Sequence, residues 1–240
     1  MKSTRYKNSR RKSSLLLLLF FHFCSLSFAQ KDTACTSLSY ALQHPLEITN
    51  LELVGQHLDT LPEEIGEMIH LKYLLLEDNQ LSFLPASMCQ LIELEELGVD
   101  GNKLSELPAC IGQLKQLKYL GMDDNQLTVF PKSFTDLTQL EELYMNGNQL
   151  AALPDDFGKL IQLEVVEMDE NQITGLPYSF GNLTNLEFLL LGNNPILQFQ
   201  ESFFKLTQLE ELMISGPTFT PERKALIRSR LPNCVLNPTN

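Results

Sequence analysis

The residues best suited to acid–base or nucleophilic chemistry have no suitable partners in this sequence. The four histidines, His22, His44, His57 and His70, all lie in the first third of the chain. Nucleophilic catalysis needs a base beside the nucleophile and a third group that orients the base, and no such set accompanies these histidines. We interpret His57 and His70 as solvent-facing turn residues, so the histidines indicate no catalytic site.

Carboxylates are abundant, with 30 aspartate and glutamate residues against 18 lysine and arginine residues. Adjacent glutamate pairs recur at a fixed interval, which is typical of a solvated face rather than of one acid–base pair. These pairs are Glu95-Glu96, Glu141-Glu142 and Glu210-Glu211. The sequence has no glycine-rich phosphate loop, no calcium-loop pattern and no C-x-x-C pair. We therefore expect no catalytic residue, no cofactor and no metal site.

The charge is distributed unevenly along the chain. Six of the 18 basic residues lie before residue 13, and no acidic residue precedes Asp32. Twelve basic residues therefore remain against 30 acidic ones beyond residue 29, a formal charge of −18. A surface this acidic repels phosphate backbones, which argues against nucleic-acid binding. The hydrophobic content of 43% is enough for one ordinary folded domain.

Residues 1–29 have the order of a secretory signal peptide. A basic stretch precedes the apolar run from Leu15 to Phe23, and Ser27-Phe28-Ala29 has small residues at the two positions that a signal peptidase reads. A transmembrane anchor is the alternative, but the apolar stretch from Leu15 to Ala29 is broken by His22 and, at about 15 residues, is shorter than the roughly 20 residues that span a bilayer. The large residues before Cys24 argue against lipidation. We predict cleavage after Ala29 and a secreted, periplasmic or cell-surface protein with no stable membrane span.

A repeat of constant length organises the rest of the chain. Its units, 23 residues long, begin at Ile48, Leu71, Leu94, Leu117, Leu140, Leu163, Leu186 and Leu209. Positions 1, 4, 6 and 11 of a unit are apolar, and six units have proline at position 15. Position 9 is asparagine in six units: Asn79, Asn102, Asn125, Asn148, Asn171 and Asn194. The constant interval predicts that each unit is one structural element stacked on the next.

This pattern, L-x-x-L-x-L-x-x-N-x-L, resembles the signature of the leucine-rich-repeat family. The ending L-P-x-x-h-x-x-L is similar to that of the plant-intracellular-Ras-group and Scribble-like class, and the resemblance covers roughly residues 48–220. It implies an α/β fold, a right-handed solenoid with a parallel β-sheet on its concave side and short helical or irregular turns on its convex side. The alternation in Leu120-Gly121-Met122 independently indicates a strand with one buried face.

Two columns of the repeat are interpreted as structural. The apolar residues at position 18, such as Phe134, Phe157 and Phe180, fall in line as a convex-side core rather than as a ligand pocket. The asparagines at position 9 offer a donor and an acceptor to backbone groups where the chain leaves each strand. We therefore assign both columns to the fold and not to binding.

Removal of the leader leaves four cysteines, an even number in a chain bound for an oxidising compartment. Cys89 and Cys110 lie at positions 19 and 17 of adjacent units; a disulfide between them is left open, and small buried apolar residues are the favoured interpretation. Cys35 and Cys234 belong to opposite caps and are too distant to pair. The segment Asn182-Leu183-Thr184 matches the N-glycosylation pattern, which matters only in a eukaryotic source.

Departures from the repeat mark the ends of the domain. We predict a signal peptide over 1–29, an N-terminal cap over 30–47, about eight repeats over 48–219 and a C-terminal cap over 220–240. Within the last cap we expect an amphipathic helix that begins at Pro221, with Thr220 as its N-cap.

Side chains at positions 3, 5, 7 and 8 point away from the core on the concave sheet, which commonly holds the ligand in this family. Aromatic residues there are interleaved with acids, a combination suited to a basic protein or peptide. The predicted partner-binding residues are Tyr73, Glu77, Glu96, Asp100, Tyr119, Asp123, Glu142, Tyr144, Glu167, Asp169 and Phe188. Tyr119 and Tyr144 are the expected anchors, with Asp100, Asp123 and Glu167 steering the approach.

The sequence thus favours a non-enzymatic protein-binding module that is exported from the cytoplasm. Two other functions remain open: a structural or adhesive surface component, and an inhibitor or regulator of a hydrolase. A soluble acidic surface without a specific partner is the remaining interpretation of the concave face.

Overall fold

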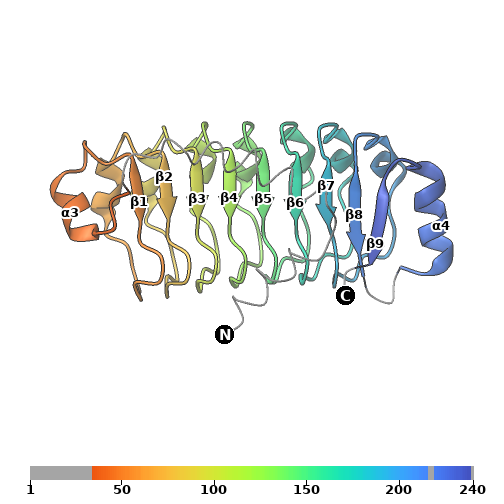
Figure 1. Ribbon diagram of the computed structural model, residues 1–240, viewed down its shortest axis with the longest axis horizontal. Coiled ribbons are helices and arrows are strands. Elements are labelled where there is room, and N and C mark those ends of the chain that lie inside the picture. Colours follow the sequence, from red (N-terminus) through yellow and green to blue (C-terminus); the bar gives the residue numbers. More distant parts are fainter. Residues whose placement is uncertain (1–33, 216–218, 239–240) are drawn as a thin grey trace. The chain divides into compact units, whose positions relative to one another are not determined.

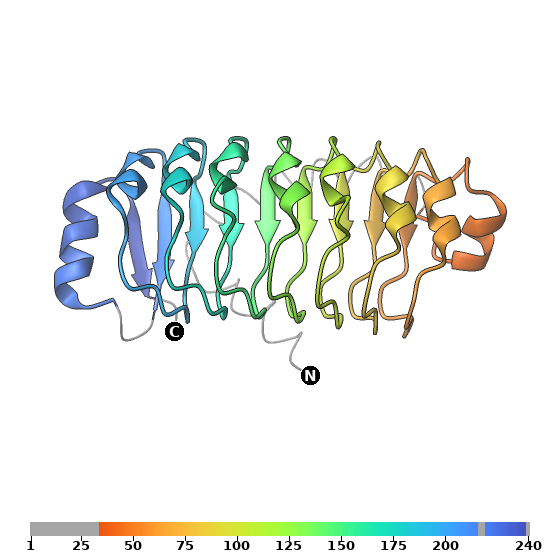
Figure 2. The same cartoon turned by 180° about the vertical axis from the view of Figure 1, so that it is seen from behind.

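The computed structural model describes residues 34–215 and 219–238, so the predicted leader and its cleavage site lie outside the described residues. Residues 35–240 form one compact unit. Its described strands form a single parallel sheet in which each strand lies beside the next one in the chain. The sheet occupies one side of this unit and the short helices of the repeats occupy the other (Figures 1 and 2). The predicted leucine-rich-repeat solenoid is confirmed.

The strands are short, and the first eight keep the 23-residue spacing of the repeat. They are β1 (Asn50–Glu52), β2 (Tyr73–Leu75), β3 (Glu96–Gly98), β4 (Tyr119–Gly121), β5 (Glu142–Tyr144), β6 (Val165–Glu167), β7 (Phe188–Leu190), β8 (Glu211–Ile214) and β9 (Val235–Pro238). Equivalent residues of successive repeats are paired, so that Tyr73 lies opposite Glu96 and Glu96 opposite Tyr119. Each position of the repeat therefore becomes a column that runs across the sheet.

A 3-10 helix follows each of the first seven strands on the other side of the unit. These helices are η2 (Glu63–Glu67), η3 (Ala86–Gln90), η4 (Ile111–Gln113), η5 (Lys132–Asp136), η6 (Phe157–Lys159), η7 (Tyr178–Asn182) and η8 (Glu201–Lys205). Pro62, Pro85, Pro131 and Pro177 are the N-cap residues of four of them. Because proline has a fixed φ and no N–H group, it ends the extended chain at this point.

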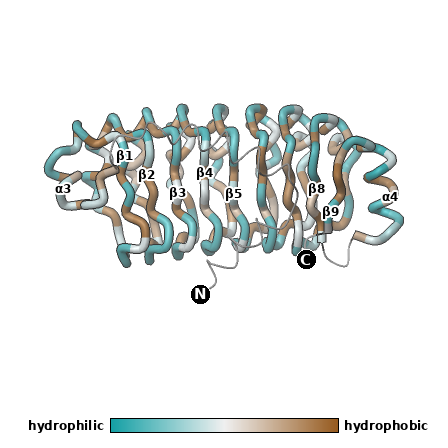
Figure 3. Tube along the Cα trace, viewed as in Figure 1, coloured by the Kyte–Doolittle hydropathy of each residue, from teal (hydrophilic) through white to brown (hydrophobic). Residues whose placement is uncertain are grey.

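The core fills the space between the sheet and the 3-10 helices. Leu140, Leu143 and Met145 in one repeat are fully buried, and equivalent residues are buried in the others. Phe157 is also fully buried, with its ring centroid 6.4 Å from Phe134 and 5.8 Å from Phe180. Apolar residues recur from one repeat to the next, and hydrophilic residues gather in the turns (Figure 3). The column at position 18 is therefore core, as predicted.

The asparagines at position 9 connect neighbouring repeats. The Asn125 Nδ2 group donates to the carbonyl oxygen of Val99 in the preceding repeat at 2.9 Å, and to those of Met122 and Asp123 in its own repeat at 3.3 and 3.1 Å. Its Oδ1 accepts from the Leu104 N–H at 3.0 Å. Asn125 is buried, so these bonds satisfy backbone groups that water does not reach. The structural role predicted for this column is confirmed.

Two helices cover the ends of the repeat array. Helix α3 (Leu38–Gln43) precedes β1, and α4 (Pro221–Arg230) begins after Thr220, whose side chain accepts from the Arg223 N–H. This is the N-cap that the sequence predicts. Strand β9 adds to β8 beyond the last repeat, and the sequence analysis did not foresee it. None of the described helices is long and apolar enough to cross a bilayer.

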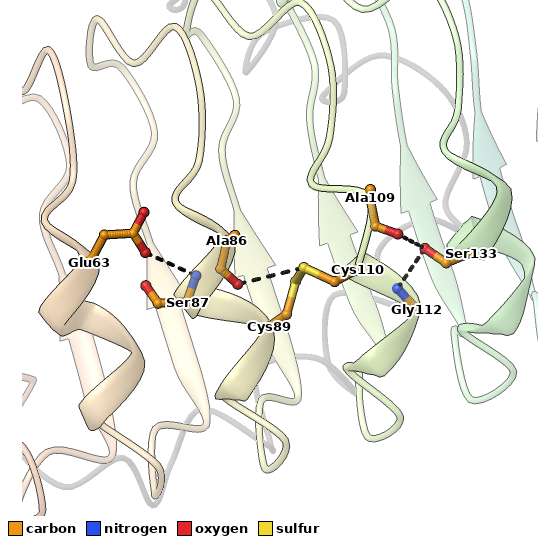
Figure 4. The surroundings of a disulfide bond; sticks show 8 residues. All are labelled: Glu63, Ala86, Ser87, Cys89, Ala109, Cys110, Gly112 and Ser133. Carbon is orange, nitrogen blue, oxygen red and sulfur yellow. Dashed lines mark hydrogen bonds between the residues drawn. A yellow bond between two sulfur atoms is a disulfide. The ribbon is translucent and has the colours of Figure 1, made fainter.

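A disulfide joins Cys89 and Cys110, whose Cα atoms are 5.9 Å apart (Figure 4). This pairing overturns the favoured interpretation of the two cysteines as separate apolar residues. The physical reason lies in the stacking, because position 19 of one repeat faces position 17 of the next. Among the first seven repeats, glycine and serine occupy this pair of positions in four of the other five pairs of adjacent repeats, with Thr135 and Asp156 in the fifth. A Cβ added to Gly66 would lie 2.5 Å from the Ser87 carbonyl oxygen. Cys35 and Cys234 are free thiols at opposite ends of the sheet.

Candidate binding surface

Side chains at positions 3, 5 and 7 of successive repeats form what we call the open sheet face. Strand residues alternate between the two sides of a sheet, and the 3-10 helices lie behind the opposite side (Figure 2). All of the predicted partner-binding residues are partly exposed on this face. The repeat arithmetic therefore places them on one continuous surface.

Tyr119 and Tyr144 lie near the middle of this face and contact each other. Their ring centroids are 5.2 Å apart, in a tilted arrangement. The Tyr144 hydroxyl donates to the Glu142 Oε2 at 2.7 Å. Burial, and then the neighbouring carboxylates, raise the pKa of both tyrosines well above the ordinary value, so both stay neutral. The pair offers two aromatic faces with one hydroxyl already held in place.

The carboxylates at position 7 have a structural role that the sequence analysis did not assign to them. Asp100 Oδ1 accepts from the Asp123 N–H at 2.6 Å, and Asp123 Oδ1 accepts from the Asn146 N–H at 2.6 Å. Asn146 Oδ1 accepts from the Asp169 N–H at 2.7 Å, and Asp169 accepts from the Gly192 N–H. Each side chain thus satisfies a backbone donor one repeat further along. The predicted steering residues Asp100 and Asp123 are therefore also part of the fold.

Two glycines at position 5 let acidic side chains lie flat on the sheet. A Cβ on Gly121 would lie 2.7 Å from Asp100 Oδ2, and one on Gly98 would collide with the Glu77 carboxylate. The Glu77 Oε2 atom is buried and has no hydrogen-bond partner. Consecutive glycines at one column position were the signal in the sequence for this close approach.

Burial on the sheet changes the ionisation of these acids. Burial raises the pKa of Glu77 to about 7, and repulsion from Asp100 adds to it. Burial and then the charge of Asp100 raise the pKa of Asp123 to about 8. The pKa of Asp169 is raised to about 6, again mainly by burial. At neutral pH the face therefore carries less negative charge than a count of its acids indicates.

The structure brings some predicted residues together and separates others. Asn146, which the site prediction omitted, joins two of the acids, because its Nδ2 group donates to Glu167 Oε2 at 3.1 Å and to Asp123 Oδ2 at 3.2 Å. Tyr73 on β2 and Phe188 on β7 each lie two strands away from the central tyrosines. Glu96 on β3 is paired between Tyr73 and Tyr119. The centre of the candidate site is therefore formed by β4, β5 and β6.

Across residues 34–215 and 219–238, no group of three or more histidine, cysteine, aspartate and glutamate side chains is placed to hold a metal ion. The carboxylates of the open sheet face instead face backbone N–H groups, an amide and a tyrosine hydroxyl. The arrangement can present aromatic surface and negative charge to a partner.

Asp123→Asn is expected to stabilise the protein at pH 8.5 by more than about 1.4 kcal/mol, the equivalent of one pKa unit. The pKa of Asp123 is about 8 in the fold against an ordinary value of 3.8. A group with a raised pKa binds more protons in the folded chain, so its contribution to stability is present below about pH 4 and is lost as the pH rises to about 8. Asparagine keeps the bond to the next N–H group, as Asn146 does one repeat later.

Thermal melting at pH 8.5 and pH 4 measures this effect, with Asp155→Asn on the helical side as the control. The Asp123→Asn variant should gain stability only at the higher pH, and the control should be unchanged at both. A gain of equal size at the two pH values would show that ionisation of Asp123 is not the cause.

The comparisons with known proteins agree with this architecture. A family model described as a leucine-rich repeat region matches residues 25–152, more than half of the chain. No curated protein sequence matches the chain significantly. Among solved structures, a leucine-rich-repeat protein of Leptospira interrogans is 34% identical with a TM-score of 0.77, and the match covers 82% of this chain and 50% of that one.

Two further solved structures share the fold at lower identity. An internalin of Listeria monocytogenes is 22% identical with a TM-score of 0.71, over 85% of this chain and 60% of that chain. The third structure is the octameric complex of Latrophilin 3, Unc5D and FLRT2, in which FLRT2 supplies the leucine-rich repeats. A chain of this complex is 28% identical with a TM-score of 0.68, and the match covers 83% of this chain and 64% of that one. This chain thus spans about half to two thirds of the length of these three proteins. The repeat motif, the parallel sheet and the family match together show that the chain belongs to the leucine-rich-repeat family.

Proposed function

We propose that the protein is an exported, non-enzymatic binding module that recognises a basic protein or peptide through its open sheet face. The observation that carries this proposal is the contact between Tyr119 and Tyr144, with ring centroids 5.2 Å apart, on a face lined by carboxylates. Tyrosine rings next to charged groups are typical of the residues that dominate binding energy in protein interfaces. The Latrophilin 3–Unc5D–FLRT2 complex shows a related fold within a protein assembly.

Export is supported by two observations. The first 29 residues have the composition of a signal peptide, with predicted cleavage after Ala29. The disulfide between Cys89 and Cys110 is the second, because disulfides form and persist mainly in oxidising compartments. The two together support the proposed secreted, periplasmic or cell-surface location.

We also assign the repeats to the class that resembles the plant-intracellular-Ras-group and Scribble-like proteins. The support is the repeat ending L-P-x-x-h-x-x-L, in which the proline precedes a 3-10 helix and the apolar residue h is buried behind the sheet. Pro131, the N-cap residue of η5, and Phe134 within η5 are one such pair.

Binding to the basic partner is expected to strengthen at low salt and as the pH rises from about 6 to about 8. Salt screens the attraction between the partner and the open sheet face. A bound cation favours the ionised forms of Glu77, Asp123 and Asp169, whose pKa values lie at about 7, 8 and 6. Ionisation of these three acids increases over this pH range, so less free energy is needed to remove protons on binding at the higher pH.

Surface plasmon resonance at pH 8.5 tests the assignment of the face, with the partner captured by pull-down from the native compartment. Asp100→Asn with Asp123→Asn removes two charges and keeps an acceptor for the backbone N–H groups of the next repeat, so it should slow association. Tyr144→Ala should mainly speed dissociation. The matched control is Glu64→Gln with Glu67→Gln, which removes two exposed charges near η2.

Salt-independent affinity, with both kinds of variant binding like the parent, would place the site elsewhere on the molecule. A single stoichiometric enzyme in the pull-down would favour the inhibitor function. Retention on cell walls or glycans without a protein partner would favour an adhesive component.

A further inference from the structure

A second surface, separate from the open sheet face, contains a small groove. It has a volume of about 190 Å³ and lies where the chain turns from the sheet toward the 3-10 helices of the second, third and fourth repeats. Its lining is mostly apolar and consists of Phe83, Leu84, Glu106, Leu107, Pro108, Ala109, Val129, Phe130 and Pro131. We call this feature the edge groove.

In the edge groove, exposed apolar residues of the second and fourth repeats flank a carboxylate of the third. Phe83 and Val129 occupy position 13 of the second and fourth repeats, and they remain 49% and 62% exposed. Glu106 occupies the same position in the third repeat, and Ala109 follows three residues later. The fold itself gains little from two apolar side chains that stay this exposed. Their position on either side of a hollow is typical of a contact surface.

A disulfide and a hydrogen bond link the third repeat, which supplies Ala109 to the lining, to the repeats on either side. Cys110 directly follows Ala109 and is bonded to Cys89 of the second repeat, which also supplies Phe83 and Leu84 to the lining (Figure 4). On the other side, the Ser133 hydroxyl of the fourth repeat donates to the Ala109 carbonyl oxygen at 2.7 Å. A groove held at fixed width loses little conformational entropy when it is filled.

We propose that the edge groove binds an extended segment of a partner protein that carries one large apolar side chain next to a lysine or arginine. The walls formed by Phe83, Val129 and Phe130 would take the apolar side chain. Glu106 is an exposed carboxylate among these walls, so it would pair with the neighbouring cation and disfavour an acidic segment. The Cys89–Cys110 disulfide prepares the groove for this segment.

A random heptapeptide library displayed on phage, selected on the intact oxidised protein, tests the proposal. The selected peptides should share an apolar residue adjacent to a basic one. Their affinity should fall at least about tenfold on Phe83→Ser combined with Val129→Ser, and also on Glu106→Lys. Affinity should be retained on Leu197→Ser, a matched control that removes a large apolar side chain, 61% exposed, from another repeat.

A separate double variant tests the contribution of the disulfide to binding. Cys89→Gly with Cys110→Ser installs the glycine–serine pair that occupies these positions at Gly112 and Ser133, so it removes the cross-link with little change in packing. The same peptides should dissociate about fivefold faster from this variant.

Three results would overturn the proposal. They are a library that yields no binding peptides, peptides that bind the Phe83→Ser and Val129→Ser variant as tightly as the parent, and peptides that lose affinity only on Tyr144→Ala. The last result would support the open sheet face as the binding site in place of the edge groove.

Discussion

Replacement of Phe157 by alanine is expected to lower the free energy of unfolding by about 3–5 kcal/mol. The Phe157 side chain is fully buried, and its ring stacks between those of Phe134 and Phe180. The parallel sheet holds the repeats on both sides in register, so they cannot easily move together to close the cavity. Chemical denaturation followed by circular dichroism measures the loss.

Tyr144→Ala is the matched control, because it also removes an aromatic ring. Tyr144 is partly exposed, and its loss would end the contact with Tyr119 and the hydrogen bond to Glu142 without leaving a closed cavity. We expect a much smaller change in stability than for Phe157→Ala. If Tyr144→Ala proved the more destabilising of the two, the assignment of buried and open faces would be reversed.

Asn125→Ala is expected to destabilise the protein by about 1–3 kcal/mol, the usual cost of a buried polar group left without a partner. Its Oδ1 is the acceptor for the Leu104 N–H, and its Nδ2 group donates to three carbonyl oxygens in two repeats. Alanine provides neither an acceptor nor a donor. The stacking of the third repeat on the fourth should therefore weaken.

Thermal melting checks this prediction, with Gln126→Ala as the control. Gln126 is the exposed neighbour of Asn125, and its truncation should change the melting temperature little. A melting temperature of Asn125→Ala equal to that of the parent would contradict the structural role of the column.

The fold was predictable because a constant interval converts sequence into geometry. The apolar residues Leu117, Leu120 and Met122 each recur as an apolar residue 23 positions later, and only stacked units can bury such columns together. The columns of leucine, asparagine and phenylalanine therefore indicated the sheet and its core before any coordinates. Strand β9 was not foreseen, because Val235–Pro238 lies beyond the last regular unit and has none of its motif.

The candidate site was predictable in composition but not in its interactions. The repeat indicated which face holds Asp100 and Asp123, but from the sequence we interpreted each side chain only as a solvated charge. Whether a carboxylate points into solvent or bonds the next backbone N–H depends on the spacing between adjacent strands, which the sequence of one repeat does not contain. The glycine at 121, which leaves room for Asp100, is the residue that favours the second arrangement.

The disulfide was left open and not favoured, because Cys89 and Cys110 occupy different positions, 19 and 17, of their units. Across the stack they are neighbours, as the contact between Thr135 Oγ1 and Asp156 Oδ2 at 3.0 Å shows in another pair of repeats. Comparison of residues at a separation of 21, and not only 23, would have paired Cys89 with Cys110 from the sequence.

The cross-link also determines how the protein would respond to tension. A stack of repeats pulled from its two ends lengthens as the outer units peel away one after another. The bond between Cys89 and Cys110 takes the intervening chain out of the line of force, because the load passes through the two sulfur atoms. Their sequence separation is 21, so at about 3.4 Å per residue the oxidised protein would reach a contour length roughly 70 Å shorter than that of the reduced one.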